Sequence, residues 1–116
     1  MKINLDKINK YISEIKDNNY LVIVEGKKDR LALNQLGIRH IITLENKPLF
    51  EIIESINEKT IVILTDLDSE GNKIFNKLRH NLQRNGIKLN NNLRKELSKT
   101  SLKQIEGLNK FIKNHS

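Results

Sequence analysis

The chain has 116 residues, a length typical of a single domain. It contains no cysteine, which excludes disulfide bonds, thiolate zinc sites and cysteine nucleophiles, so a bound metal is expected to be a hard cation held by oxygen. The net charge of +7 is uneven: residues 1–72 hold ten Lys or Arg and twelve Asp or Glu, whereas residues 73–116 hold eleven and two. A basic segment of this kind suits a polyanionic partner, and a solvated surface kept for solubility is the plainer alternative.

Helical and strand patterns alternate through the first 65 residues. Three apolar runs predict strands, over residues 20–25, 38–44 and 60–65. Helical spacing of apolar residues predicts helices over 5–17, from Lys27 to a stop at Gly37, and from the turn before Pro48 to Ile56. Strict alternation predicts a parallel sheet whose ligand site lies outside the carboxyl ends of the strands.

The pattern continues more weakly in the second half. Ser69 is expected to cap a helix that ends at Gly86, and residues 87–89 are expected to form a short fourth strand. A helical turn over 93–97 follows, and Ser101 is expected to open a capping box before a final amphipathic helix. The predicted fold class is therefore α/β, with a mainly parallel four-stranded sheet, flanking helices, and additional helices at both ends of the chain.

Three acidic side chains follow two of the apolar runs. Asp66 and Asp68 come after the run over 60–65, and Glu25 ends the run over 20–25. Mg²⁺ is usually held by one or two carboxylates together with substrate phosphates, and three clustered carboxylates need a cation or a raised pKa. The acids therefore predict a site for one or two Mg²⁺ ions, with Mn²⁺ as a substitute. A helix cap or loop role is the alternative for each acid taken alone.

Basic residues near these acids are candidate contacts to a nucleic-acid backbone, with solvated surface as the alternative for each. They are Lys27, Lys28, Arg30, Lys73, Arg79 and Arg84. The low aromatic content argues against base stacking and sequence-specific reading of single strands. The segment over residues 1–6 lacks the apolar stretch of a secretory signal and no long apolar run occurs, so we expect a cytoplasmic protein that does not bind membranes.

Two motifs resemble those of the Toprim domain. The first is Val24-Glu25-Gly26-Lys27-Lys28-Asp29, and the second is Leu64-Thr65-Asp66-Leu67-Asp68-Ser69-Glu70-Gly71, about forty residues later. The resemblance covers roughly residues 19–89, with residues 90–116 as a basic helical extension of a single domain over 1–116. It implies a Rossmann-like sheet, Glu25 as catalytic glutamate and metal ligand, and Asp66 and Asp68 as the Mg²⁺-binding pair.

The form of the motifs is most similar to the bacterial ribonuclease that matures 5S ribosomal RNA and to small stand-alone Toprim proteins. The resemblance implies a Mg²⁺-dependent phosphodiester enzyme, an RNA-processing nuclease, with RNA favoured over DNA and a ribonucleoprotein as a further partner. A topoisomerase is not expected, because strand passage needs a tyrosine nucleophile on a second domain. A primase is not expected either, since the zinc-binding and extra polymerase domains are absent.

Two other functions remain open from the residues. One is a non-catalytic module that binds RNA or a ribonucleoprotein and uses Mg²⁺ to dock phosphates. The other is a small-molecule phosphohydrolase, suggested by Asp66 and Asp68 alone, although that class generally places its nucleophilic aspartate after the first strand, where this chain has Glu25. The oligomeric state is not indicated by any pattern.

Overall fold

The computed structural model describes residues 3–116 and shows a four-stranded sheet in the order β2-β1-β3-β4. All three strand pairings are parallel, as predicted. The strands are β1 (Leu21–Val24), β2 (Ile41–Thr43), β3 (Thr60–Ile63) and β4 (Lys88–Leu89). The chain moves outward from β1 to β2 and then returns to β3 on the other side of β1. The direction of winding therefore reverses between β1 and β3, where open α/β sheets usually bind their ligands.

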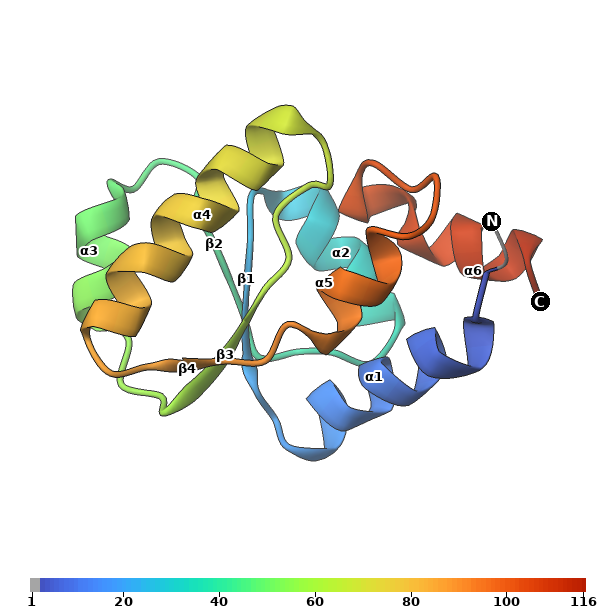
Figure 1. Ribbon diagram of the computed structural model, residues 1–116, viewed down its shortest axis with the longest axis horizontal. Helices are drawn as coiled ribbons and strands as arrows, with labels where there is room; N and C mark the ends of the chain where they lie inside the picture. Colours follow the sequence, from blue (N-terminus) through green and yellow to red (C-terminus); the bar gives the residue numbers. More distant parts are fainter. Residues whose placement is uncertain (1–2) are drawn as a thin grey trace.

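Helices cover both faces of the sheet (Figure 1). They are α1 (Leu5–Asp17), α2 (Lys27–Gln35), α3 (Leu49–Ser55), α4 (Ser69–Arg84), α5 (Asn92–Leu97) and α6 (Leu108–Asn114), and a short 3₁₀ helix, η1 (Ile105–Gly107), precedes α6. One face packs against α3 and α4, and the other packs against α1, α2, α5 and α6. The sheet is therefore the middle layer of three, which confirms the predicted fold class.

The two central strands are buried on both faces, as their unbroken apolar sequences predict. Val22 and Val24 point toward the α1 side, whereas Leu21 and Ile23 point toward the α3 side. Neighbouring residues of a strand project to opposite faces, so one short run supplies both cores. Because these strands are packed on both faces, the loops at their carboxyl ends begin from fixed positions.

Several predicted boundaries were wrong. All four strands are shorter than the apolar runs, and β3 ends at Ile63, so Asp66 and Asp68 lie in the loop beyond the strand. Asp68, and not Ser69, is the N-cap of α4, because its Oδ1 accepts a hydrogen bond from the Gly71 amide at 2.8 Å. An aspartate one position earlier offers an equivalent cap.

The predicted capping box at Ser101 was also wrong. Helical structure there begins with η1 at Ile105, after an N-cap at Gln104 that makes no side-chain hydrogen bond. Main-chain groups of this segment are instead used elsewhere, since the Leu67 amide donates to the Lys103 carbonyl at 2.6 Å. Within residues 3–116, no helix is both long and apolar enough to cross a membrane.

Candidate functional site

The acids at the carboxyl ends of β1 and β3 are joined directly. Glu25 follows β1, and its Oε2 accepts a hydrogen bond from the Asp66 main-chain amide at 2.7 Å. These residues are 41 positions apart in the sequence, and the parallel pairing of β1 with β3 brings them to the same edge of the sheet. The structure thus brings together the two motifs that the sequence placed on separate strands.

Each carboxylate of the pair after β3 is also fixed by a main-chain amide. Asp66 Oδ1 accepts from the Ile105 amide at 2.9 Å, and Asp68 Oδ1 accepts from the Gly71 amide at 2.8 Å. A Cβ atom at Gly71 would overlap the Asp66 carbonyl oxygen, so the loop closes tightly against the first turn of α4. Gly71 is therefore more than the turn residue that its sequence context indicates.

Arg94 of α5 also binds the loop that contains Asp66 and Asp68. Its guanidinium donates to the carbonyl oxygens of Thr65 and Asp66 at 2.7 and 3.0 Å, and to Asn72 Oδ1 at 3.0 Å. The guanidinium carbon also lies 4.4 Å from the centre of the Phe75 ring. Arg94 is only 6% exposed, although the predicted helical turn over 93–97, confirmed as α5, gave no sign of its burial. No local signal distinguishes a buried arginine from a surface one, because its partners are distant in sequence.

The electrostatics of the loop follow from burial and from neighbouring charges. Burial raises the pKa of Glu25, and repulsion by Asp66 and Asp68 adds to the effect, whereas the hydrogen bond from the Asp66 amide opposes it. Burial likewise raises the pKa of Asp66, and the Ile105 amide opposes that rise. Burial lowers the pKa of Arg94 to about 10, so its charge remains positive at neutral pH. The carboxylates of the site are therefore partly buried and repel one another, and a bound cation would reduce that repulsion.

Two further acids extend the site. Asp29 is 7% exposed and accepts a hydrogen bond from the Gly26 amide at 3.1 Å, and burial raises its pKa to about 6. Glu106, next to Ile105, acts electrostatically on both Asp29 and Asp66. An acidic cavity of about 490 Å³ is lined by Glu25, Asp29, Glu45, Asp66 and Glu106, together with Gly26, Lys27 and Lys28. Glu106 follows no strand or motif, whereas Asp29 is the last residue of the first motif that resembles the Toprim domain.

Among residues 3–116 the acids do not form a ready-made cage: no three His, Cys, Asp or Glu side chains are placed to hold one metal ion. The donor chemistry nevertheless suits a hydrated hard cation. Glu25, Asp66 and Asp68 each use one carboxylate oxygen for an amide and retain the other. Mg²⁺ keeps several waters and is commonly held by one or two protein carboxylates, so the three residues fit this ion without a closed cage.

The basic residues singled out in the sequence lie in four different places. Lys27 and Lys28 line the acidic cavity, with Arg30 one turn further along α2. Lys73 is exposed and pairs with Glu70 at 3.5 Å. Arg79 lines a separate cavity between α4 and α5. Arg84, near the end of α4, lines a groove with α3, so the structure does not gather the six into a single patch.

The chain is similar in sequence to a known protein family and to several archaeal proteins. A family model described as "Toprim domain" matches residues 19–91. The chain is 34% identical over 82 residues to a UPF0292 protein of Thermococcus sibiricus, covering 69% of this chain and 65% of that protein. It is 36% identical over 74 residues to a UPF0292 protein of Pyrococcus abyssi, covering 62% and 56%. The matches therefore span less than two thirds of the length of these relatives.

Two solved structures are also similar. A putative protein from Aquifex aeolicus superposes with a TM-score of 0.78 at 28% identity, covering 89% of this chain and 96% of that one. The primase of Aquifex aeolicus, a structure of its zinc-binding and RNA polymerase domains, superposes with a TM-score of 0.53 at 22% identity. The latter covers 93% of this chain but 28% of the primase, and it carries information about the fold alone.

Proposed function

Because the chain belongs to the Toprim domain family, we propose that it is a Mg²⁺-dependent enzyme acting on nucleic-acid phosphodiesters, namely an RNA-processing nuclease. One observation carries the proposal: the loops after β1 and β3 meet where the winding of the sheet reverses, so Glu25 lies within electrostatic reach of Asp66 and Asp68. Three carboxylates at such a point suit a cation acting on phosphate better than a purely structural role, since their mutual repulsion is unfavourable without a cation.

The roles follow from the free oxygen of each carboxylate. We assign Asp66 and Asp68 to Mg²⁺ binding, and Glu25 to metal binding and proton transfer through Oε1. The raised pKa of Glu25 brings its proton equilibrium closer to neutral pH, which favours general acid or base action. Bound Mg²⁺ would supply Lewis acidity and a more acidic water molecule. Arg94 and the Ile105 amide keep the loop fixed while these groups act.

A specific observation supports a second candidate, a non-catalytic module that uses Mg²⁺ to dock RNA or a ribonucleoprotein. No three acids within residues 3–116 are placed to enclose one ion, and a single loosely held ion is sufficient for docking phosphate. The proposal also includes a single domain over residues 1–116, a cytoplasmic location, RNA preferred over DNA, and Mn²⁺ as a substitute ion.

The test compares cleavage of a structured RNA and of a duplex DNA, with Mg²⁺ or Mn²⁺, by the wild type and three isosteric variants. Glu25→Gln, Asp66→Asn and Asp68→Asn each keep an oxygen that can accept the amide hydrogen bond, and asparagine remains a good N-cap. Each variant should therefore fold, while cleavage falls by about 10²-fold or more. Asp17→Asn, at the end of α1, removes the same charge far from the site and should cleave like the wild type.

The outcome separates the two candidates. If the wild type binds RNA but turns over none with either ion, the docking module is the correct assignment. If cleavage requires Mg²⁺ and survives all three substitutions, the assignment of the site is wrong.

A further inference from the structure

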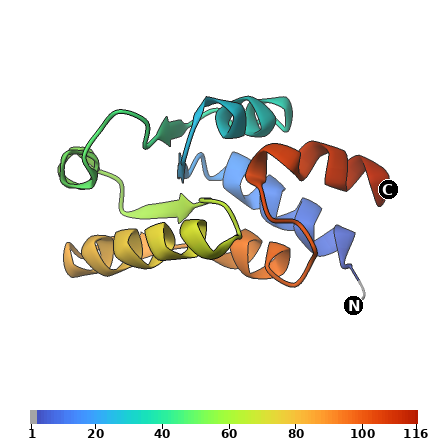
Figure 2. The same ribbon diagram turned by 90° about the horizontal axis from the view of Figure 1, so that it is seen from above.

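A second cavity, of about 340 Å³, lies between α4 and α5 beside the acid loop. Figure 2 shows these two helices following one another along one side of the molecule. The α4 wall includes Phe75 and Arg79, and the α5 wall includes Arg94 and Lys95. Every charged residue of this lining is a cation, whereas five acids and two lysines line the acidic cavity described above. We call this second cavity the α4–α5 groove.

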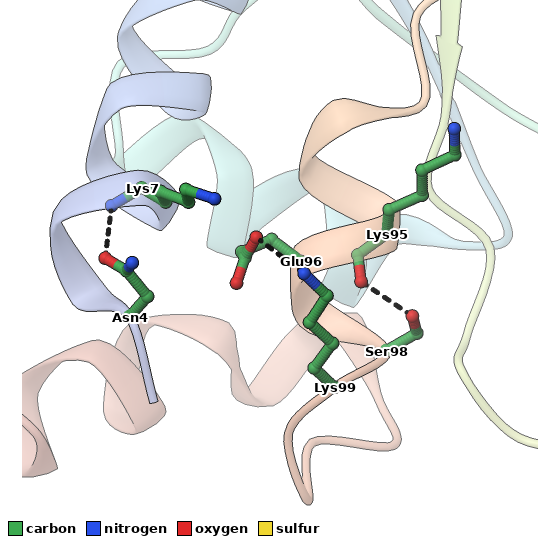
Figure 3. Close-up of polar contacts among 6 residues, drawn as sticks. All are labelled: Asn4, Lys7, Lys95, Glu96, Ser98 and Lys99. Atoms are coloured by element: carbon green, nitrogen blue, oxygen red, sulfur yellow. Dashed lines mark hydrogen bonds and ion pairs between the residues drawn. The ribbon is translucent and has the colours of Figure 1, made fainter. Parts of the chain in front are cut away.

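Two cations of the α4–α5 groove are uncompensated by acids. Among residues 3–116, the ion pairs join His40 to Glu58, Lys73 to Glu70, and Lys99 to Glu96, so neither Lys95 nor Arg79 pairs with an acid. Arg79 donates only to the neutral side chain of Gln83, at 3.4 Å. Figure 3 shows the exposed Lys95 side chain projecting away from the Glu96–Lys99 pair. Both positive charges are therefore available to an anionic ligand.

The groove is physically continuous with the acid loop through Arg94 and Asn72. Arg94 bridges the Asp66 carbonyl and the Asn72 side chain, and Asn72 lines the groove one turn after the N-cap Asp68. A buried, permanently charged guanidinium at this junction adds positive potential, which a low-dielectric setting screens weakly. From Asn72 to Arg79, α4 rises about 10 Å, so this wall of the groove is long enough to lie along a short stretch of a nucleic-acid backbone.

From these features we propose that the α4–α5 groove binds the phosphate backbone of a nucleic-acid strand and leads it to Glu25, Asp66 and Asp68. This inference rests on the proposed function and specifies the side from which the strand enters. Lys27 and Lys28 have a minor role, because the five acids that line the same cavity offset their charge. Arg79 and Lys95 carry the binding through charge, and Asn72 and Asn76 contribute neutral donors.

The experiment measures the affinity of a fluorescently labelled RNA hairpin and of a single-stranded DNA, in EDTA, over a series of salt concentrations. The double variant Arg79→Ala with Lys95→Ala should bind both probes about tenfold more weakly, and the slope of log K against log salt should fall by about 2. A matched control removes the same charge elsewhere, through Lys110→Ala with Lys113→Ala on α6, and should bind within about twofold of the wild type. A comparison variant, Lys27→Ala with Lys28→Ala in the acidic cavity, should lose less affinity than the groove variant.

The inference is overturned if the groove variant keeps the wild-type affinity and salt slope, or if the wild type binds neither probe. It is also overturned if the Lys27 and Lys28 variant loses more affinity than the groove variant. Cleavage assays on the same proteins separate this result from the proposed function. A wild type that binds through Arg79 and Lys95 but never cleaves supports the groove and refutes the nuclease. A wild type that cleaves, with a KM unaffected by the groove substitutions, refutes the groove and leaves the nuclease standing.

Discussion

At the scale of single residues, main-chain amides hold the carboxylates of the candidate site. The amides of Asp66, Ile105 and Gly71 each bind one oxygen of Glu25, Asp66 or Asp68. Hydrogen bonds to a charged acceptor are stronger than neutral ones and fix its direction. The remaining oxygens are thus presented in a defined arrangement before any ligand arrives, which lowers the cost of binding one.

Gly71 is the residue at which a single added carbon should disturb this arrangement most. Gly71→Ala places a Cβ atom onto the Asp66 carbonyl oxygen, so the loop or the start of α4 must move. We expect a loss of about 2–4 kcal/mol in the free energy of unfolding, measured by urea denaturation, with weakened Mg²⁺ binding.

Gly107→Ala is the matched control, because a Cβ atom there would lie 3.6 Å from the nearest side-chain carbon of Leu102, an ordinary contact. It should change the free energy of unfolding by no more than about 0.5 kcal/mol. Equal stabilities for the two variants would show that the loop does not pack tightly against α4.

Asp29 should make the stability of the metal-free protein depend on pH. Its pKa rises from 3.8 to about 6 on folding, so its contribution to stability is fully present below about pH 4 and is lost as pH rises through 6. The loss amounts to at most about 3 kcal/mol between these limits. Asp29→Asn keeps an oxygen for the Gly26 amide and lacks the titration, so in EDTA it should gain stability relative to the wild type as the pH rises from about 4 to 7.

The difference between the two unfolding curves isolates Asp29, because Glu25 and Asp66, whose pKa values are also raised, titrate in both proteins. Parallel pH dependences for the wild type and Asp29→Asn would contradict the prediction.

At the scale of elements, a side chain completes the sheet where β4 is too short to do so. The carbonyl oxygens of Lys59, just before β3, and of Ile61, on β3, accept from the amides of Lys88 and Asn90. Beyond them the β4 segment turns away, and Arg94 donates to the carbonyl of Thr65. Buried carbonyl groups rarely lack a partner, so Arg94 takes the role that a longer β4 would have had.

The segment after β4 is consequently part of the fold and more than a basic appendage. It contributes five buried apolar residues to the core on the α1 side: Leu93, Leu97, Ile105, Leu108 and Phe111. It also contributes Arg94 and the Ile105 amide to the acid loop. The family match ends at residue 91, just before this segment begins.

A chain cut after Asn91 should therefore lose cooperative folding. Removal of five buried side chains, each worth about 1.5–3 kcal/mol, costs about as much as the whole stability of a typical domain. We expect no cooperative thermal transition by circular dichroism, together with binding of a hydrophobic dye. A chain lacking only residues 115 and 116, both exposed, should melt close to the full chain. A sharp transition in the shorter chain would show that residues 92–116 are dispensable.

At the scale of the whole molecule, the sequence predicted the layers well and the contacts between distant segments poorly. Unbroken apolar runs predicted the parallel sheet, and that topology predicted that the acids after β1 and β3 lie at one edge, because each strand is recognised from a local pattern. Arg94 and the Ile105 amide were missed as site residues, because they reach Asp66 by tertiary packing across 28 and 39 positions, and Glu106 was missed for the same reason. The lengths of the strands were overestimated because the loops after them also contain buried apolar residues, such as Leu64 and Leu67 after β3.

Charge is also organised at this scale. The acidic cavity and the α4–α5 groove lie on either side of the Asp66 loop, so negative and positive potentials meet at the predicted Mg²⁺ site. Net charge alone, at +7, predicts attraction to a polyanion without indicating a direction of approach. The arrangement of the two cavities supplies that direction.

The hydrogen bonds that tie the acid loop to Lys103 and Ile105 also fix an order of assembly during synthesis. A chain emerges from its amino end, so Glu25, Asp66 and Asp68 are all made before the amide that orients Asp66 exists. A nascent chain can pair β1 with β3 at that stage and still lack a finished acid site. The candidate site is therefore completed only after Ile105 has been made, and premature termination anywhere before Ile105 yields a product without it.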